Sequence, residues 1–362
     1  MSEENDVILK EIEKNRKKFR VDHFDIILSE YVSKYEKEEI ILNPPYQRIF
    51  RWSIEDQSTL IESILLGIPL PPIFALQRPD GKWEIIDGLQ RTQTILNFFN
   101  TEKSFKLQGL KILTELNEKE SSELPREIIL KVKNSRIRVE LVEETEDIFS
   151  QYLLFNRLNS NGEKLSEQEK RNFLIYKKNS FFYDNIQKLG NEENFLKVLG
   201  WNKKEHNERI RKQENIEYVI KYFLARFTSK EESKKSHNTI EEFINDEIIS
   251  FLNYATQEIL ESEFSLFKKT FDFLSNNFGL DTLKKNGKRA NNISNRFTVI
   301  TGISFLIEEN IKDVQTISEL MHDFFESKEY LRLTKNGYSP TKRIYELNRY
   351  SYLFFKEGLK NG

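Results

Sequence analysis

The spacing of apolar residues changes near Thr145, and this change constrains the fold more than any other feature of the sequence. Before it, short runs rich in β-forming residues alternate with short helical patterns and with turns that contain proline or glycine. After it, apolar residues recur at helical spacing, as Ile148, Tyr152 and Phe155 do at i, i+4 and i+7. A mixed first part and a helical second part are therefore expected.

The length of 362 residues is typical of two domains, or of one domain with a large extension. Only 13 glycines and 8 prolines occur, which argues against a disordered chain or a turn-rich all-β chain. These observations predict the α+β class. Three segments are expected: a charged helical arm at 1–20, a small mixed domain at 21–165 and a mainly α-helical domain at 166–362.

Turn and capping residues predict where elements begin and end in the mixed domain. Ser53, followed by Asp56 three residues on, resembles a capping box, and Gly67 stands where a helix would end. Pro79-Asp80-Gly81 is typical of a hairpin turn. The expected helices lie at 26–37, between Ser53 and Gly67, and at 89–99, and the expected strands at 39–42, 73–78, 82–86 and 137–142.

The second part contains a further capping box, formed by Ser166 and Glu169. Beyond residue 171, amphipathic helices follow one another with short polar breaks, and no internal repeat is present. Helices are expected at 216–227, 240–260 and 264–278, among others.

Composition excludes several classes of site. The chain contains no cysteine, so disulfides, cysteine-bound metal centres and thiol catalysis are excluded. The first 20 residues are charged and do not resemble a signal peptide, and no run approaches the roughly 18 apolar residues of a membrane helix. A cytoplasmic protein without membrane contact is expected. The net charge of −2 means that any contact with DNA needs a local basic patch.

The stretch from Trp83 to Thr94 contains the most informative motif, Asp87-Gly88-Leu89-Gln90-Arg91, at an expected strand-to-helix junction. A helix N-terminus presents unpaired amides and the positive end of the helix dipole, which suit an anion. Gly88 lets the backbone approach a ligand, Arg91 can hold a phosphate, and Asp87 can bind a metal ion or orient a water. The alternative is structural: Asp87 caps the helix and Arg91 pairs with a surface carboxylate.

Two further polar stretches are candidates for the walls of such a site. In the first, prolines precede Tyr46, Gln47 and Arg48, which suit contacts with a base and a phosphate; the alternative is an aromatic loop that covers the core. In the second, Asn156 and Arg157, together with Asn159, would complete a polar pocket. Its alternative is a tight turn between two helices.

Taken in order, these motifs resemble those of the N-terminal domain of GmrSD-type (type IV) restriction endonucleases and related phage-defence proteins. The resemblance covers about residues 40–170. Within this range, the segment 68–71 and the pair Leu165-Ser166 also match the pattern. It implies a ParB/sulfiredoxin-like fold and a hallmark Asp-Gly-Gln-Gln-Arg motif associated with nucleotide binding and hydrolysis. This chain has Leu89 where the first glutamine is usual and retains Asp87, Gly88, Gln90 and Arg91.

The resemblance implies a nucleoside triphosphatase, or a sensor of GTP or ATP with Mg²⁺, in an anti-phage or modification-dependent restriction system. The partners expected are the nucleotide, DNA, a partner nuclease or other defence subunit, and further copies of the chain. Asp87, Gln90 and Arg91 would act in catalysis, with Asp87 at the metal. The residues expected to hold the nucleotide are Tyr46, Gln47, Arg48, Gly88, Thr92, Asn156, Arg157 and Asn159.

Two other functions stay open on the sequence: a metal-dependent DNA nuclease that uses Asp87, and a non-catalytic adaptor or DNA-specificity subunit. The histidines His23, His206, His237 and His322 lack metal-ligand spacing, so no HNH nuclease domain is expected. No Walker A sequence is present.

A short basic segment also has two interpretations. Lys284, Lys285, Lys288 and Arg289 would contact a DNA backbone in one and form a solvated loop in the other.

Overall fold

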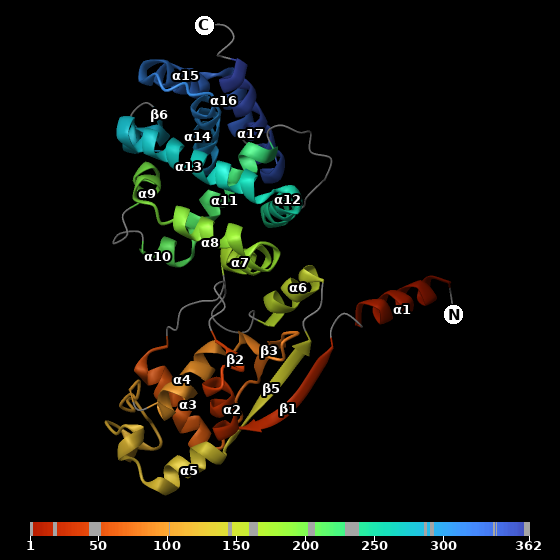
Figure 1. Ribbon diagram of the computed structural model, residues 1–362, viewed down its shortest axis with the longest axis vertical. Coiled ribbons are helices and arrows are strands. Elements are labelled where there is room, and N and C mark those ends of the chain that lie inside the picture. The colour runs from red at the N-terminus through yellow and green to blue at the C-terminus, as the bar shows by residue number, and fades with distance from the viewer. Residues whose placement is uncertain are drawn as a thin grey trace. The chain divides into compact units, whose positions relative to one another are not determined.

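The computed structural model describes residues 3–16, 20–42, 52–100, 102–143, 147–158, 166–201, 207–228, 239–285, 288–289, 293–335, 337 and 339–357. The chain divides into two compact units, residues 1–164 and 165–362 (Figure 1). The first is mixed α and β and the second is built mainly of helices, so the chain is α+β. None of the described helices is long and apolar enough to cross a membrane.

The first unit contains a five-stranded mixed sheet in the order β1-β5-β3-β4-β2. β1 pairs antiparallel with β5, β5 parallel with β3, β3 antiparallel with β4, and β4 parallel with β2. The strands are β1 (Val21–Ile27), β2 (Ile40–Ile41), β3 (Ile73–Gln77), β4 (Trp83–Asp87) and β5 (Arg136–Glu143).

Helices cover one face of this sheet and enclose the main core of the unit, which includes Tyr31, Ile61, Ile85 and Val139 (Figure 1). The helices of the unit are α1 (Glu3–Arg16), α2 (Leu28–Glu36), α3 (Ile54–Leu66), α4 (Leu89–Phe99), α5 (Arg126–Asn134) and α6 (Ile148–Leu158). Because side chains alternate along a strand, buried Leu76, Ile86 and Val142 belong to the opposite face. The helix α6 contacts β4.

Local signals set several boundaries of the first unit as expected. Ser53 and Asp56 form the predicted capping box of α3, and Gly67 ends that helix in the left-handed conformation at φ 71°. The predicted hairpin turn joins β3 to β4, where Gly81 has φ 83°.

The helix predicted at 26–37 was confirmed as α2, which begins at Leu28 because residues 21–27 form β1. Neither β1 nor the helix α5 was predicted. β1 forms by pairing with β5, more than a hundred residues away, so its partner is invisible to a local pattern.

The helical unit begins at the predicted capping box, in which the Ser166 hydroxyl accepts a hydrogen bond from the Glu169 amide of α7. Its helices are α7 (Glu167–Lys178), α8 (Ser180–Leu189), α9 (Glu193–Leu199), α10 (Asn207–Arg211), α11 (Glu214–Thr228), α12 (Ile240–Tyr254), α13 (Gln257–Asn277), α14 (Ile293–Glu308), α15 (Val314–Glu326), α16 (Lys328–Thr334) and α17 (Pro340–Glu357).

One expectation for the helical unit was wrong. The helix predicted at 240–260 ends at Tyr254, because Thr256 caps a new helix by accepting a hydrogen bond from the Ile259 amide. The helix that Thr256 caps is α13, and the segment predicted as a helix at 264–278 forms its later part. A 3₁₀ turn, Gly279–Leu283, follows it, and the basic segment then forms two short paired strands, β6 (Lys284–Lys285) and β7 (Lys288–Arg289).

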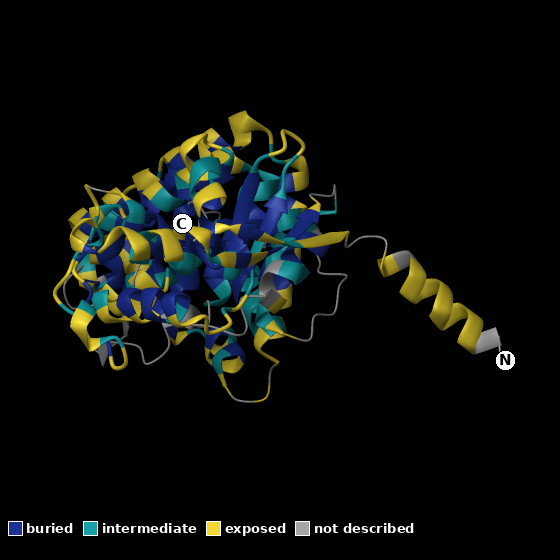
Figure 2. Ribbon diagram, turned by 90° about the horizontal axis from the view of Figure 1, so that it is seen from below, coloured by how far each residue is buried: buried dark blue, intermediate teal, exposed yellow. Residues whose placement is uncertain are grey.

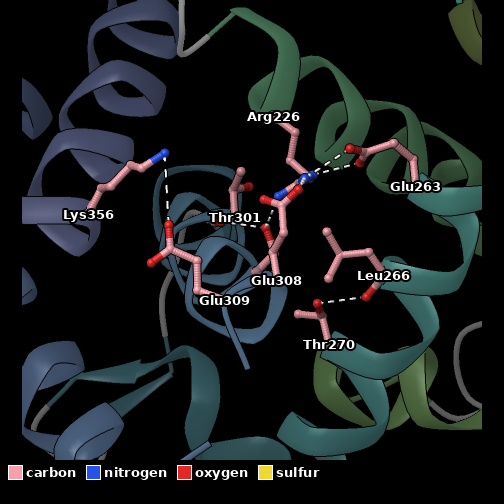
Figure 3. A network of polar contacts seen from close by, with 9 residues as sticks. Arg226, Glu263, Leu266, Thr270, Thr301, Glu308, Glu309 and Lys356 are labelled. Atoms are coloured by element: carbon pink, nitrogen blue, oxygen red, sulfur yellow. Dashed lines mark hydrogen bonds and ion pairs between the residues drawn. The ribbon is translucent and has the colours of Figure 1, made fainter. Parts of the chain in front are cut away.

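Arg226 of α11 is the centre of a buried polar network in the helical unit (Figure 3). Its side chain is 2% exposed and donates to both carboxylate oxygens of Glu263 in α13, at 2.6 and 2.9 Å. It also bonds to the Ser304 hydroxyl at 3.1 Å and lies 3.1 Å from Glu308, both in α14. A single cation therefore links three helices.

Candidate functional site

The strand-to-helix junction after β4 is formed by Asp87, Gly88 and Leu89. Asp87 ends β4, Gly88 has the left-handed φ of 96°, and Leu89 begins α4. A Cβ atom added to Gly88 would lie 2.4 Å from Cδ1 of Ile73 in β3. Both the positive φ and this close neighbour require glycine, so Gly88 lets the chain turn from strand to helix against β3.

Asp87 and Arg91 form an ion pair across the first turn of α4, with 2.8 Å between Oδ2 and Nη2. The Arg91 side chain is 11% exposed and that of Asp87 is 32% exposed. Nη1 of Arg91 also donates to the carbonyl oxygens of Pro71 and Pro72, the latter at 3.0 Å. Arg91 thus holds the segment before β3 against α4, and it leaves the Asp87 carboxylate as the more accessible group.

Burial lowers the pKa of Arg91, although the charge and hydrogen bond of Asp87 act in the opposite direction. Arginine nevertheless keeps its proton in proteins, so the guanidinium remains a cation beside Asp87.

The N-terminus of α4 has no side-chain cap among the residues that the structure describes. The first amides of a helix have no carbonyl partner within the helix, and the dipole adds a partial positive charge there. This positive end begins directly after Asp87. A partly exposed carboxylate and the positive end of a helix dipole therefore lie side by side.

Gln90 links this helix end to a distant part of the chain. Its Oε1 atom accepts a hydrogen bond of 3.1 Å from the backbone amide of Trp52, which precedes α3. Gln90 therefore fixes the position of the residue that follows the polar stretch 43–51 in sequence.

Thr92 lies on the core side of α4. Its side chain is fully buried, and its hydroxyl lies 2.8 Å from the hydroxyl of Tyr31 in α2. Burial raises the pKa of Tyr31, so this phenol stays protonated and able to donate. We expected Thr92 to contact a nucleotide, but its hydroxyl is directed into the core.

The structure brings Asp87, Gly88, Gln90 and Arg91 together at one junction. Two other candidates lie in α6: Asn156, of which only the backbone is described, and Arg157, whose side chain is exposed. The remaining candidates, Tyr46, Gln47, Arg48 and Asn159, lie outside the described residues.

The sequence interpretation missed two features near the junction. The carbonyls of Pro71 and Pro72 act as acceptors for Arg91, and no sequence pattern marks a backbone acceptor of this kind. Glu84 is 3% exposed within β4, on the face opposite that of Trp83 and Ile85. An acidic residue inside the apolar run of a strand is a signal that could have identified it, because a buried carboxylate needs partners.

Asp87 is the carboxylate at the junction that could take part in holding a metal ion. Among the described residues, no group of three or more histidine, aspartate or glutamate side chains is placed to hold a metal. Mg²⁺ is usually bound by one or two carboxylates together with water and substrate phosphates. Asp87 fits an ion shared with a phosphate ligand in this way.

Comparison with known proteins gives one match, to a family of domains. A family model described as the N-terminal domain of GmrSD restriction endonucleases matches residues 28–176, a segment that includes the junction and α6. No curated protein and no solved structure matches the chain. Residues 28–176 are therefore similar to the N-terminal domains of GmrSD restriction endonucleases.

Proposed function

We propose that the first unit binds a nucleoside triphosphate with Mg²⁺ at the N-terminus of α4, and hydrolyses it, as part of a restriction or phage-defence system. One observation carries this proposal: the partly exposed Asp87 carboxylate stands beside the N-terminus of an 11-residue helix, for which the described residues supply no side-chain cap. The family match supports the restriction and phage-defence setting.

Charge explains why a metal ion belongs in this proposal. The amides of α4 attract phosphate oxygens, whereas the Asp87 carboxylate repels them. Asp87 would hold Mg²⁺, which would offset that repulsion and supply charge stabilisation for phosphoryl transfer. The protein's own contribution is positioning, which is how most catalysis of this reaction arises.

Arg91 receives a different role from the one that the sequence suggested. Its Nη1 atom donates to two carbonyls and its Nη2 atom to Asp87, so the guanidinium orients the carboxylate and the junction. We therefore assign Arg91 as a positioning residue. Gln90 would act similarly, through its bond to the Trp52 amide.

The finer expectations from the family stay part of the proposal. They are a ParB/sulfiredoxin-like fold, GTP or ATP as the ligand, a wall that contains Tyr46, Gln47 and Arg48, and a second wall from Asn156, Arg157 and Asn159. Leu89, which replaces the usual first glutamine of the motif, is 8% exposed and packs into the core.

A pair of aspartate variants tests this function. Asp87→Asn keeps the shape of the side chain but removes its charge, so Mg²⁺-dependent binding and turnover of ATP, GTP, CTP and UTP should fall at least about tenfold for the preferred nucleotide. Asp80→Asn is the matched control: Asp80 lies in the β3–β4 turn of the same unit, and nucleotide binding should be unchanged.

The outcomes separate the rival functions. Unchanged nucleotide affinity in Asp87→Asn, with Mg²⁺ present, would refute the proposed site. Binding without turnover in the unmodified chain would favour a sensor or adaptor. Mg²⁺-dependent nicking of DNA by the purified chain, lost in Asp87→Asn, would favour a nuclease.

A further inference from the structure

The N-terminal helix α1 exposes apolar side chains along its length. Every described side chain of α1 is exposed, including Val7 at 64%, Ile8 at 48%, Leu9 at 50% and Ile12 at 49% (Figure 2). A lone helix of 14 residues is marginally stable in water, because most helical stability comes from packing of an apolar face. Among the described residues, α1 therefore has no contact that buries its apolar side chains.

Three of these apolar residues lie on one side of α1. Ile12 lies four positions after Ile8, one helical turn further on, and Leu9 flanks both, so the three side chains form a continuous stripe. Asn5 and Asn15 extend this stripe at i−3 from Ile8 and i+3 from Ile12, which is the seam pattern of a short coiled coil.

Charge is distributed unequally along the same segment. Residues 3–6 include three acidic residues and no basic one, whereas residues 14–18 include four basic residues and no acidic one. A parallel pair of such helices would bring like charges together at both ends. An antiparallel pair would set each acidic end against a basic end, and would also oppose the two helix dipoles favourably.

We propose that α1 pairs antiparallel with α1 of a second copy of this chain. With Ile8 of one copy opposite Ile12 of the other, Asn5 lies opposite Asn15, and the two Leu9 side chains flank the seam. An alternative explanation of the charge order is that it stabilises an isolated helix through the helix dipole, but that explanation gives the apolar stripe no function. Pairing explains both the charge order and the apolar stripe.

The contact between two α1 helices is small, which limits the affinity of the dimer. A 14-residue helix is about 21 Å long, so a pair buries less than a standard protein interface of roughly 1,600 Å². The dimer is therefore weak and depends on protein concentration.

The mass of the full chain in solution, measured by light scattering or sedimentation over a range up to the order of 100 µM, tests the pairing. The mass should rise with concentration towards that of a dimer. Ile8→Asp with Ile12→Asp should weaken association at least about tenfold. Val7→Asp should not, because Val7 lies among charged residues on another side of α1.

Constant monomer mass over this range would overturn the proposal, as would association that survives in the Ile8→Asp, Ile12→Asp variant. The chain has no cysteine, so introduced thiols report orientation without background. Under oxidation, a mixture of the Asn5→Cys and Asn15→Cys chains should form a cross-linked dimer. Cross-linking of the Asn5→Cys chain alone would instead show a parallel pair and refute the antiparallel arrangement.

Discussion

At the scale of single residues, Glu62 shows how a buried charge holds a loop. It lies in α3 with 8% exposure and accepts backbone hydrogen bonds from Ile112 at 2.9 Å and Leu113 at 2.8 Å. Burial opposes ionisation of this carboxyl, but the amide hydrogen bonds outweigh it and lower its pKa. The Glu62 carboxylate thus helps to attach the irregular segment between α4 and α5 to α3, together with the Ser58 hydroxyl, which accepts a hydrogen bond of 2.9 Å from the Gln108 amide.

This lowered pKa makes the stability contributed by Glu62 depend on pH. A carboxyl group with a lower pKa in the folded state stabilises the fold above its unfolded pKa, near 4.5, and loses that effect as pH falls through its folded pKa. Glu62→Gln should therefore reduce the free energy of unfolding by about 1–2 kcal/mol at pH 7. The difference from the unmodified chain should shrink below pH 4.5.

Urea denaturation of the full chain at pH 7 and at lower pH checks this expectation. Glu115→Gln, at an exposed position in the same segment, is the control and should leave stability unchanged at both pH values. A difference between Glu62→Gln and the unmodified chain that stays constant with pH would contradict the assignment.

The candidate site also shows what a residue pattern can and cannot predict. The motif predicted that Asp87 and Arg91 would lie at a strand-to-helix junction, because proline, glycine and apolar spacing mark such a junction locally. It did not predict that these two residues would pair with each other. Nor did it predict the acceptors of Arg91, since the carbonyls of Pro71 and Pro72 become neighbours only when the chain folds.

At the scale of elements, the Arg226 network joins α11, α13 and α14 through one buried cation. The bidentate pair with Glu263 raises the pKa of Arg226 above its usual value, against the effect of burial. The buried phenol of Tyr222 lies near this network, and burial raises its pKa to about 12.

Arg226→Met should destabilise the helical unit by about 3–5 kcal/mol, because removing one partner of a buried pair leaves the other charge uncompensated. Lys212→Met is the matched control: the Lys212–Glu208 pair has a similar distance of 2.9 Å, but its side chains are 56% and 77% exposed. Breaking an exposed pair should change stability much less. Equal effects of the two changes in denaturant unfolding would contradict the importance of burial.

Element boundaries followed the sequence where a local signal set them. The capping boxes at Ser53 and Ser166 were confirmed, as was the hairpin turn before β4. The predictions of boundaries failed where features outside the local apolar pattern determine the element. β1 exists because β5 pairs with it, and the break before α13 depends on Thr256, a cap that apolar periodicity does not reveal.

At the scale of the whole molecule, the family match ends at residue 176, near the start of the helical unit. The proposed nucleotide site lies wholly in the first unit, and so does the helix proposed to pair with a second copy. Failure of the pairing would therefore leave the nucleotide site untouched, and the two proposals can be tested separately.

Hydrogen exchange of backbone amides in the full chain, with and without nucleotide and Mg²⁺, tests the central claim most directly. Saturating Mg²⁺–nucleotide should slow exchange in residues 88–92, because phosphate oxygens would accept hydrogen bonds from the first amides of α4. Asp87→Asn should abolish this protection, whereas Asp80→Asn should retain it. Unchanged exchange at residues 88–92, under conditions in which the chain binds nucleotide, would contradict the account.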